Sequence, residues 1–348
     1  MQSKRCFFIG KGTRSYGTDV NQFSFIRRPY FLPLSLFLGS TTGLFTYYQY
    51  QAYRKGLPEG VTPARHALYS TIPACTMTRI AGWIANLRLP EVLRPSVVGL
   101  FSRALGCDAR EAEKEVGEYE SLGEFFARRL KSGARPLERG AALVSPVDGK
   151  VLATGCINWN DDADWLEQIK GTKYSLSAFL GHDHALINNL RQRKEGTSLY
   201  YTTLYLSPAS YHRFHAPTDL KLSNSKKIPG ELLPVAPWMM KLAPGLVSLN
   251  QRHLISGNWS QGHLVMVPVG ATNVGSIVID VLPGEKVKKG QELGHFRLGS
   301  TVVLLFTGPQ GMKFVPQVGR SVKLGQALIR DNGQGWWFSN TFFGLWTK

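Results

Sequence analysis

The sequence contains few cysteines and few acidic residues, and each shortage narrows the class of protein. Its 348 residues include four scattered cysteines, Cys6, Cys75, Cys107 and Cys156, and no Cys-x-x-Cys pair. The spacing therefore indicates neither a zinc site nor a disulfide framework. Only 24 Asp and Glu residues stand against 41 Lys and Arg residues, which gives a net charge of +17. Such a charge favours polyanionic partners, either nucleic acid or an acidic membrane surface.

The usual signatures of nucleic-acid binding are missing as well. The sequence has no zinc-finger spacing, no RNP-like aromatic motif and no long basic helix. In the N-terminal third, hydrophobic segments accompany the basic residues instead. The chain is 43% hydrophobic and 19% charged, a composition typical of a folded globular protein. These observations predict a globular protein with a membrane partner and no nucleic-acid partner.

Residues 1–28 form a basic segment that is nearly free of acidic side chains. Six lysines and arginines accompany a single acidic residue, Asp19, and several serines and threonines. This composition is typical of a mitochondrial transit peptide, so the segment is predicted to be a targeting leader. A disordered basic tail is the alternative.

A long uncharged run follows within residues 29–51. Nineteen consecutive residues from Tyr30 to Tyr48 carry no charge, and basic residues flank them on both sides. About twenty apolar residues are enough to cross the hydrocarbon core as a helix, so a transmembrane anchor is predicted. Pro33, Gly39 and Gly43, with nearby hydroxyl side chains, leave a buried or interfacial helix as the alternative.

Residues 52–135 are predicted to form a linker with membrane-associated helices. Between Thr76 and Leu105, apolar residues are mixed with arginines, and Pro90 and Pro95 divide the stretch into two short amphipathic helices. Such helices can lie in a lipid headgroup layer, but any surface helix that packs on a core shows the same apolar stripe. A further helix is predicted over Glu111 to Leu130.

Residues 136–348 consist largely of short apolar runs separated by glycine and proline turns. Examples are Leu199 to Leu206, His263 to Val269, Ser276 to Leu282 and Thr301 to Phe306. These runs are typical of β-strands, and Thr301 to Phe306 is predicted to be a buried central strand. The fold class is therefore α+β, with a mainly β domain preceded by a transmembrane helix and amphipathic membrane-facing helices.

Two turns of the β region place a polar side chain beside a glycine. Asp148 lies in Ser145-Pro146-Val147-Asp148-Gly149-Lys150, where an ordinary hairpin turn is the alternative. Ser300 follows Gly299, which interrupts a strand. Glycine would let the serine side chain approach the preceding carbonyl group closely, and a β-bulge is the alternative.

Two histidines follow the strand that ends at Leu206. His212 and His215 lie in Tyr211-His212-Arg213-Phe214-His215, and a pair of histidines on a loop is suited to proton transfer near neutral pH. Metal binding is the alternative, and further ligands would come from residues 182–184 (His182, Asp183 and His184). No recognised spacing joins the two sets.

Taken together and in this order, the segments resemble the phosphatidylserine decarboxylase family from about Phe125 to Phe306. Leu298-Gly299-Ser300-Thr301 matches the self-cleavage motif of that family, and its Tyr-His-Arg-x-His and Pro-Val-Asp-Gly motifs are present too. The basic leader and the single hydrophobic span resemble the mitochondrial members. One departure is Gln251, where many relatives carry glutamate, and it puts the role of a carboxylate at that position in doubt.

The resemblance implies that the chain cuts itself. Asp148, His215 and Ser300 would form a hydrolase-like triad, and the cut would fall between Gly299 and Ser300. A β chain ending at residue 299 and an α chain of residues 300–348 would remain associated within the catalytic domain, residues 136–348. Ser300 would become a pyruvoyl group, the cofactor of the family.

The resemblance also implies the reaction and its place. The pyruvoyl group would form a Schiff base with the amine of phosphatidylserine and accept electrons as CO2 leaves, and His212 is the candidate proton donor. No metal is expected. The enzyme would lie in the mitochondrial inner membrane with its catalytic domain facing the intermembrane space, and a homodimer is an arrangement that the resemblance leaves open.

Three other functions are compatible with parts of the sequence. A membrane-anchored serine hydrolase would use Ser300, His215 and Asp148 without self-cleavage, so an uncut chain would favour it. A basic membrane-binding scaffold would not need all three residues. A soluble pyruvoyl-dependent amino-acid decarboxylase would leave the hydrophobic span unexplained.

Overall fold

The structure, a computed structural model, describes residues 80, 82–157, 165–169, 172–191, 196–237, 240, 245–271, 277–296 and 300–331. The predicted leader, the predicted anchor and Gly299 lie outside the described residues. Within these ranges, no helix combines the length and the apolar character needed to cross a membrane.

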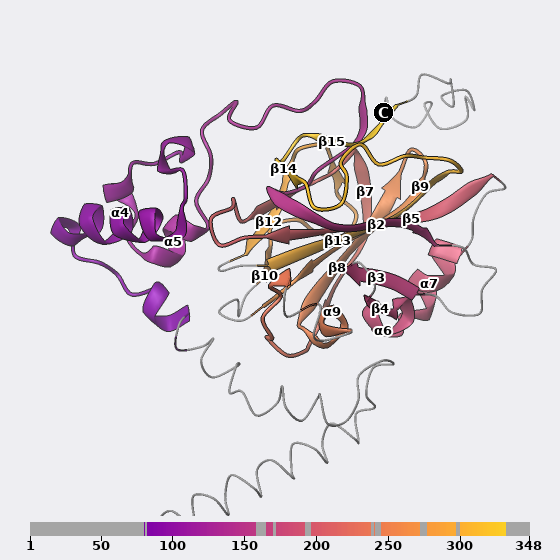
Figure 1. Cartoon of the computed structure of the whole chain (residues 1–348), viewed down its shortest axis with the longest axis horizontal. Coiled ribbons are helices and arrows are strands. Elements are labelled where there is room, and N and C mark those ends of the chain that lie inside the picture. Colours follow the sequence, from indigo (N-terminus) through magenta and orange to yellow (C-terminus); the bar gives the residue numbers. More distant parts are fainter. Residues whose placement is uncertain are drawn as a thin grey trace, which may run out of the picture.

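An eight-stranded antiparallel sheet forms the body of the domain (Figure 1). Its strand order is β11-β7-β8-β9-β13-β5-β2-β14. The strands of this sheet, in chain order, are β2 (Gly149–Ile157), β5 (Thr197–Leu206), β7 (Leu220–Ile228), β8 (Arg252–Trp259), β9 (Gly262–Val269), β11 (Lys286–Val287), β13 (Ser300–Pro309) and β14 (Ser321–Val322). The α+β class with a mainly β domain is therefore confirmed.

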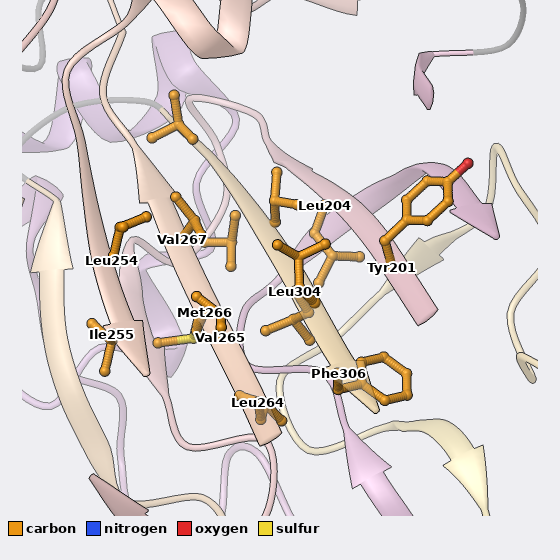
Figure 2. Packing of buried hydrophobic residues seen from close by; sticks show 14 of the residues in the cluster. Tyr201, Leu204, Leu254, Ile255, Leu264, Val265, Met266, Val267, Leu304 and Phe306 are labelled. Atoms are coloured by element: carbon orange, nitrogen blue, oxygen red, sulfur yellow. The ribbon is translucent and has the colours of Figure 1, made fainter. Parts of the chain in front are cut away.

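Strand β13 lies at the centre of the sheet, between β9 and β5. It pairs with β5 from Ser300↔Leu206 to Pro309↔Thr197, and with β9 from Thr301↔Val269 to Phe306↔Leu264. Every residue from Ser300 to Gly308 is buried. Side chains of β5, β8, β9 and β13 pack together in the core, as Figure 2 shows. The prediction of a buried central strand at Thr301 to Phe306 is confirmed.

Smaller sheets surround this body. A three-stranded sheet has the order β10-β12-β6, and two-stranded sheets join β1 to β15 and β3 to β4. Their strands are β1 (Ala141–Val144), β3 (Trp165–Ile169), β4 (Thr172–Ser175), β6 (Arg213–His215), β10 (Ile277–Ile279), β12 (Glu292–Phe296) and β15 (Ala327–Arg330). The turn that contains Asp148 joins β1 to β2, which lie in different sheets, so the hairpin alternative for this turn is wrong.

Short helices in the described part of the chain accompany the sheets. Figure 1 shows them close to β3 and β4. They are α6 (Leu176–Phe179), α7 (His184–Arg191) and α9 (Leu246–Leu249).

A helical region precedes the β domain and lies to one side of it (Figure 1). It comprises helical residues at 80 and 82–85, followed by η1 (Glu91–Leu93), α4 (Arg94–Leu105), η2 (Ala109–Glu111), η3 (Val116–Glu118) and α5 (Leu122–Phe126). The predicted helix over Glu111 to Leu130 is therefore wrong, because local caps break it into single turns. Ser121 accepts a hydrogen bond from the Glu124 N–H and starts α5, and its own backbone is extended.

The amphipathic helices predicted between Thr76 and Leu105 are present in part. Pro95 lies in the first turn of α4, a position that proline tolerates, and so it begins this helix instead of interrupting it. Val98 packs against Tyr119 and Phe125, which gives α4 a small core of its own. Several apolar side chains of this region are individually exposed, and we refer to this set of residues as the apolar face: Ile80, Trp83, Ile84, Leu87, Val92, Leu93 and Leu100.

Candidate active site

Ser300 is the first residue of the central strand. It pairs with Leu206 at the end of β5, and the residue is completely buried. The hydroxyl oxygen of Ser300 has no hydrogen-bond partner among the described residues. A buried hydroxyl group without a partner is costly, and Thr202, Thr203 and Thr301 of the same two strands share this feature with Ser300.

The loop that carries His212 connects β5 to β6, and these strands pair with β13 and β12, which lie on either side of the segment around Gly299. Residues 207–212, here called the histidine loop, run from the end of β5 to the start of β6. At the first end, Leu206 pairs with Ser300, and at the other end the N–H of Phe296 donates a 2.9 Å hydrogen bond to the carbonyl oxygen of His212. Phe296 and Ser300 are thus both fixed against ends of the histidine loop. The fold therefore brings His212 close to the sequence that surrounds the predicted cut.

The His212 ring is completely buried and holds one proton in a defined place. Its Nδ1 lies 2.7 Å from the carbonyl oxygen of Ser210, which can only accept, so Nδ1 carries the proton and donates it. Nε2 has no partner among the described residues and presents a lone pair. Burial lowers the pKa of His212 to about 3, so the ring is neutral at physiological pH.

His215 lies at the end of β6 with both ring nitrogens hydrogen-bonded. Nδ1 donates to the carbonyl oxygen of Gly290 at 2.9 Å, and Nε2 accepts from the hydroxyl group of Tyr211 at 3.1 Å. Burial lowers the pKa of His215 and raises that of Tyr211, so both groups are neutral near pH 7. The lone pair of His215 Nε2 can take up a proton once the Tyr211 hydroxyl group no longer donates its hydrogen bond to this atom.

Asp148 is held by a buried arginine. Arg135 donates three hydrogen bonds to its carboxylate, at 2.7 to 3.1 Å, and the backbone N–H of Leu324 donates a fourth at 2.8 Å. The same guanidinium group binds Glu111 of η2 at 2.6 Å. Gly149 follows Asp148, and a Cβ atom there would lie 2.9 Å from the carbonyl oxygen of Tyr205, so only glycine fits without movement.

The structure brings the backbones of Asp148 and His215 together, but their side chains have other partners. The N–H of His215 donates to the carbonyl oxygen of Pro146, two residues before Asp148, at 2.9 Å. No hydrogen bond joins the two side chains in the described part of the chain. The negative charge of Asp148 still acts to raise the pKa of His215, against the larger effect of burial.

Two arginines near this site did not emerge from the sequence as functional candidates. Arg135 holds Asp148, and Arg128 follows α5 as a buried cation. Arg128 is two residues beyond Phe126, whose ring lies 4.0 Å, centre to centre, from the ring of His212. The signal available in the sequence was that both arginines belong to the segment from Phe125 to Pro136, where the resemblance begins.

Two buried polar side chains, Asn250 and Arg252, hold the backbone of neighbouring loops in place. The side chain of Asn250 accepts from the N–H of Leu233 and donates to the carbonyl oxygens of Leu233 and Gly270. Arg252, also buried, donates to four backbone carbonyl groups, of residues 178, 179, 248 and 250. Gln251, between them, has both its backbone N–H and its carbonyl group in hydrogen bonds. Its backbone, not a carboxylate, provides the contact that the structure records at this position.

The histidines that could have bound a metal, His182, His184, His212 and His215, do not form a cluster of ligands in the described part of the chain. In the described ranges, one group of three potential ligands has its donor atoms within 4.8 Å of one another, and it consists of Asp280, Glu292 and His295. Glu292 already forms an ion pair with Arg213. His182 contacts Ser177 instead, and Asp183 pairs with Lys226.

Comparison with known proteins identifies the family. Residues 122–330 match the family described as "Phosphatidylserine decarboxylase". A protein of Rattus norvegicus named "Phosphatidylserine decarboxylase proenzyme, mitochondrial" is 32% identical over 345 residues, which cover 85% of this chain and 84% of the relative. A protein of the same name from Caenorhabditis elegans is 35% identical over 286 residues, 76% of this chain and 73% of the relative. "Phosphatidylserine decarboxylase proenzyme 1, mitochondrial" of Schizosaccharomyces pombe is 30% identical, covering 80% of this chain and 85% of its own length. The chain therefore belongs to the phosphatidylserine decarboxylase family.

Proposed function

We propose that this chain converts phosphatidylserine to phosphatidylethanolamine and CO2, with a pyruvoyl group that it makes from Ser300. The observation that carries the proposal is the position of Ser300, whose unpartnered hydroxyl group is completely buried at the start of the central strand and beside the histidine loop. The relatives are named proenzymes of this activity, which agrees with maturation by a cut in the chain.

The proposed self-cleavage needs one water molecule and no other reactant. The Ser300 hydroxyl oxygen adds to the carbonyl carbon of Gly299, the bond from that carbon to the Ser300 nitrogen breaks, and an ester replaces the peptide. Loss of the Ser300 Cα proton then expels the Gly299 carboxylate and leaves a dehydroalanine. Its tautomer takes up water and releases ammonia, so the α chain begins with a pyruvoyl group and the β chain ends with a carboxylate.

In this scheme His215 takes the proton from Ser300, and Asp148 stabilises the positive charge that results. His212 and His215 are both neutral in the structure, which a general base requires. Asp148 would act through its charge, because its oxygens remain bonded to Arg135 and Leu324.

The burial of Ser300 also favours self-cleavage over the hydrolase alternative. A hydrolase must present its serine to external esters in the uncut chain, whereas Ser300 of the uncut chain has no exposed surface. In the decarboxylase, lipid needs access to this position only after the cut. Attack on the preceding residue of the same chain needs no such access.

The residues around Ser300 fit a pyruvoyl group. Residues 301–309 keep their pairing with β5 and β9 after a cut before residue 300, because the pairs lie between strands and not along the chain. When formed, the group would supply an electron sink for decarboxylation. His212 would hold or move a proton at Nε2, and since this atom presents a lone pair, it must take up a proton before it can donate one.

The chain is further proposed to work at a mitochondrial membrane. The named relatives are mitochondrial, and the apolar face places exposed tryptophan, leucine, isoleucine and valine side chains next to arginines. Side chains of this kind can enter a headgroup layer and hold the site near its lipid substrate. We propose the inner membrane, with the catalytic domain in the intermembrane space.

Intact mass spectrometry of the purified protein tests the proposal. Wild type should give two chains that meet between Gly299 and Ser300, with a pyruvoyl group at the start of the α chain. Ser300→Ala should remain a single chain. Thr202→Val is the matched control, because Thr202 in β5 is also completely buried with an unpartnered hydroxyl group, and it should cleave as wild type does.

Activity on phosphatidylserine is measured with the same three proteins. CO2 release by wild type and Thr202→Val, and none by Ser300→Ala, is the expected result. An uncut wild-type chain would overturn the pyruvoyl mechanism and favour the serine hydrolase. A cut chain that releases no CO2 from phosphatidylserine would support self-cleavage but would show that phosphatidylserine is not the substrate.

A further inference from the structure

Arg128 is a buried cation that forms no ion pair with a described residue, and its one side-chain partner among these residues is the Cys107 thiol, whose pKa is raised by burial. Its residue is 4% exposed, and its Nε and Nη1 atoms have no hydrogen-bond partner among the described residues. The guanidinium carbon lies 5.0 Å from the centre of the Phe125 ring, which attracts it only weakly. A buried and unpaired charge is strongly destabilising. Such a group in a folded protein points to an anionic ligand.

This cation lies beside the proposed catalytic residues. Phe126 packs on the His212 ring, and the carbonyl oxygen of Ala127 accepts a 2.8 Å hydrogen bond from Arg213, the residue after His212. The charge of Arg128 also acts to lower the pKa of His212, after burial. The unpartnered Nε2 of His212 and the unpartnered Nε and Nη1 of Arg128 are thus buried polar atoms in one region of the fold.

Arg128 also lies where the helical region meets the β domain. Phe125, under its guanidinium group, belongs to the small core that Val98 of α4 and Tyr119 share. The apolar face lies on the same helical region. A lipid held by that region could therefore place its headgroup at the junction that contains Arg128, without its tails leaving the bilayer.

The headgroup of the proposed substrate carries two anions, a phosphodiester and a carboxylate. A cation that binds the carboxylate would stabilise the substrate more than the transition state, in which this negative charge leaves the carboxylate as CO2 forms. Such a contact would slow the reaction. A cation on the phosphodiester binds the substrate and the transition state equally, since the phosphodiester does not react. A planar guanidinium group also suits two phosphate oxygens.

We propose that Arg128 binds the phosphodiester of the lipid headgroup and so positions it for decarboxylation. This inference rests on the proposed function, because it takes the headgroup of that substrate as the ligand. The inference goes beyond the proposed function because it assigns a residue that binds the phosphodiester, a part of the substrate that does not react.

The test compares Arg128→Gln with wild type and with Arg129→Gln in the full-length, self-cleaved protein. Arg129 is the neighbouring arginine, 62% exposed, and serves as a charge-matched control. The probe is glycerophosphoethanolamine, which has the phosphodiester but no carboxylate, and its Kd is measured by calorimetry. The KM for short-chain phosphatidylserine is measured by CO2 release.

Arg128→Gln should raise the Kd of glycerophosphoethanolamine and the KM by a similar factor, about 10- to 100-fold, while Arg129→Gln changes neither. A raised KM with an unchanged Kd would mean that Arg128 contacts the carboxylate, and would overturn the proposal. An unchanged Kd and KM would show that Arg128 does not bind the headgroup. A wild-type chain that binds the probe but releases no CO2 would refute the proposed function and not this inference.

Arg128→Lys is a second variant that keeps the buried charge, and it serves as the test if Arg128→Gln does not fold. Lysine retains the charge but loses the paired donors of the guanidinium group, so the Kd should rise several-fold, and Arg129→Lys should leave it unchanged. Equal Kd values for Arg128→Lys and Arg129→Lys would overturn the proposal.

Discussion

Arg135 joins Asp148 to Glu111 through a single guanidinium group, and so connects the turn before β2 to the helical region. It donates three hydrogen bonds to Asp148 and one to Glu111. The side chains of Arg135 and Asp148 are 8% and 13% exposed. An ion pair that is this well buried contributes to stability mainly because removing one partner leaves the other charge unpaired.

Arg135→Gln should destabilise the protein and slow its self-cleavage. The substitution leaves the Asp148 carboxylate buried without its cation, a loss of about 3–5 kcal/mol in the free energy of unfolding. Urea unfolding of the uncleaved chain and the rate of appearance of the α chain measure the two effects. Arg139→Gln, an exposed arginine four residues later, is the control, and equal cleavage rates for the two variants would contradict the role given to Arg135.

The central strand and the order of the motifs could be predicted from the sequence, but the roles of the arginines could not. Thr301 to Phe306 is apolar without alternation, which is enough to predict a strand buried on both faces. An arginine in a sequence is most often exposed, and the burial of Arg128 and Arg135 depends on contacts with Phe125 and Asp148. Glu111 to Leu130 has helical composition, yet its backbone is interrupted and side-chain caps such as Ser121 start each short helix anew. These caps depend on local geometry that periodicity does not record.

The partners of Asp148 show the same limit. A motif predicts which residues meet, and the backbone hydrogen bond from His215 to Pro146 agrees with it. It does not predict that Arg135 donates hydrogen bonds to the Asp148 carboxylate, or that the Gly290 carbonyl oxygen accepts a hydrogen bond from His215 Nδ1. These contacts come from segments 13 and 75 residues away along the chain, whose approach is decided by the packing of the whole domain.

Acidification should destabilise the folded chain through His212. The pKa of this histidine is lowered from 6.5 to about 3 by burial, with a further effect from the nearby charge of Arg128. Between these two values the unfolded chain binds a proton that the folded chain does not, so stability falls as the pH is lowered from 6.5 towards 3. The contribution is about 1.4 kcal/mol for each pH unit. Urea unfolding at several pH values should show a smaller pH dependence for His212→Gln than for wild type. The exposed His184→Gln should keep the wild-type slope, and equal slopes in all three would be evidence against a neutral buried His212.

His212→Gln should separate the two activities of the protein. Self-cleavage depends on His215 in the proposed scheme, so the variant should still form both chains. Decarboxylation requires a proton at the histidine loop, and loss of a positioned proton-transfer group lowers the rate by about 100-fold or more. Mass spectrometry follows the first activity and CO2 release the second. A variant that cleaves and decarboxylates at the wild-type rate would remove His212 from the mechanism.

The two chains should stay together after the cut. All of the pairs from Ser300↔Leu206 to Pro309↔Thr197 join the α chain to the β chain, as do the pairs with β9. Size-exclusion chromatography should therefore elute both chains in one peak in buffer, and should separate them only at denaturant concentrations that unfold the domain. Separate elution in buffer would show that the central strand does not hold the chains together.

Trp83→Ser should impair the enzyme on bilayers but not on dissolved substrate. Trp83 lies on the apolar face and is 67% exposed, and Leu282, on the β domain, is 68% exposed. If the apolar face enters the headgroup layer, Trp83→Ser loses apolar contact with lipid and its activity on phosphatidylserine vesicles falls by about 3- to 10-fold. Activity on a water-soluble short-chain phosphatidylserine depends only on the active site and should be unchanged. Leu282→Ser removes an equally exposed apolar side chain elsewhere and should alter neither activity. Because both variants reduce exposed apolar area, an equal loss on vesicles would mean that general surface hydrophobicity, and not the helical region, governs access to the membrane.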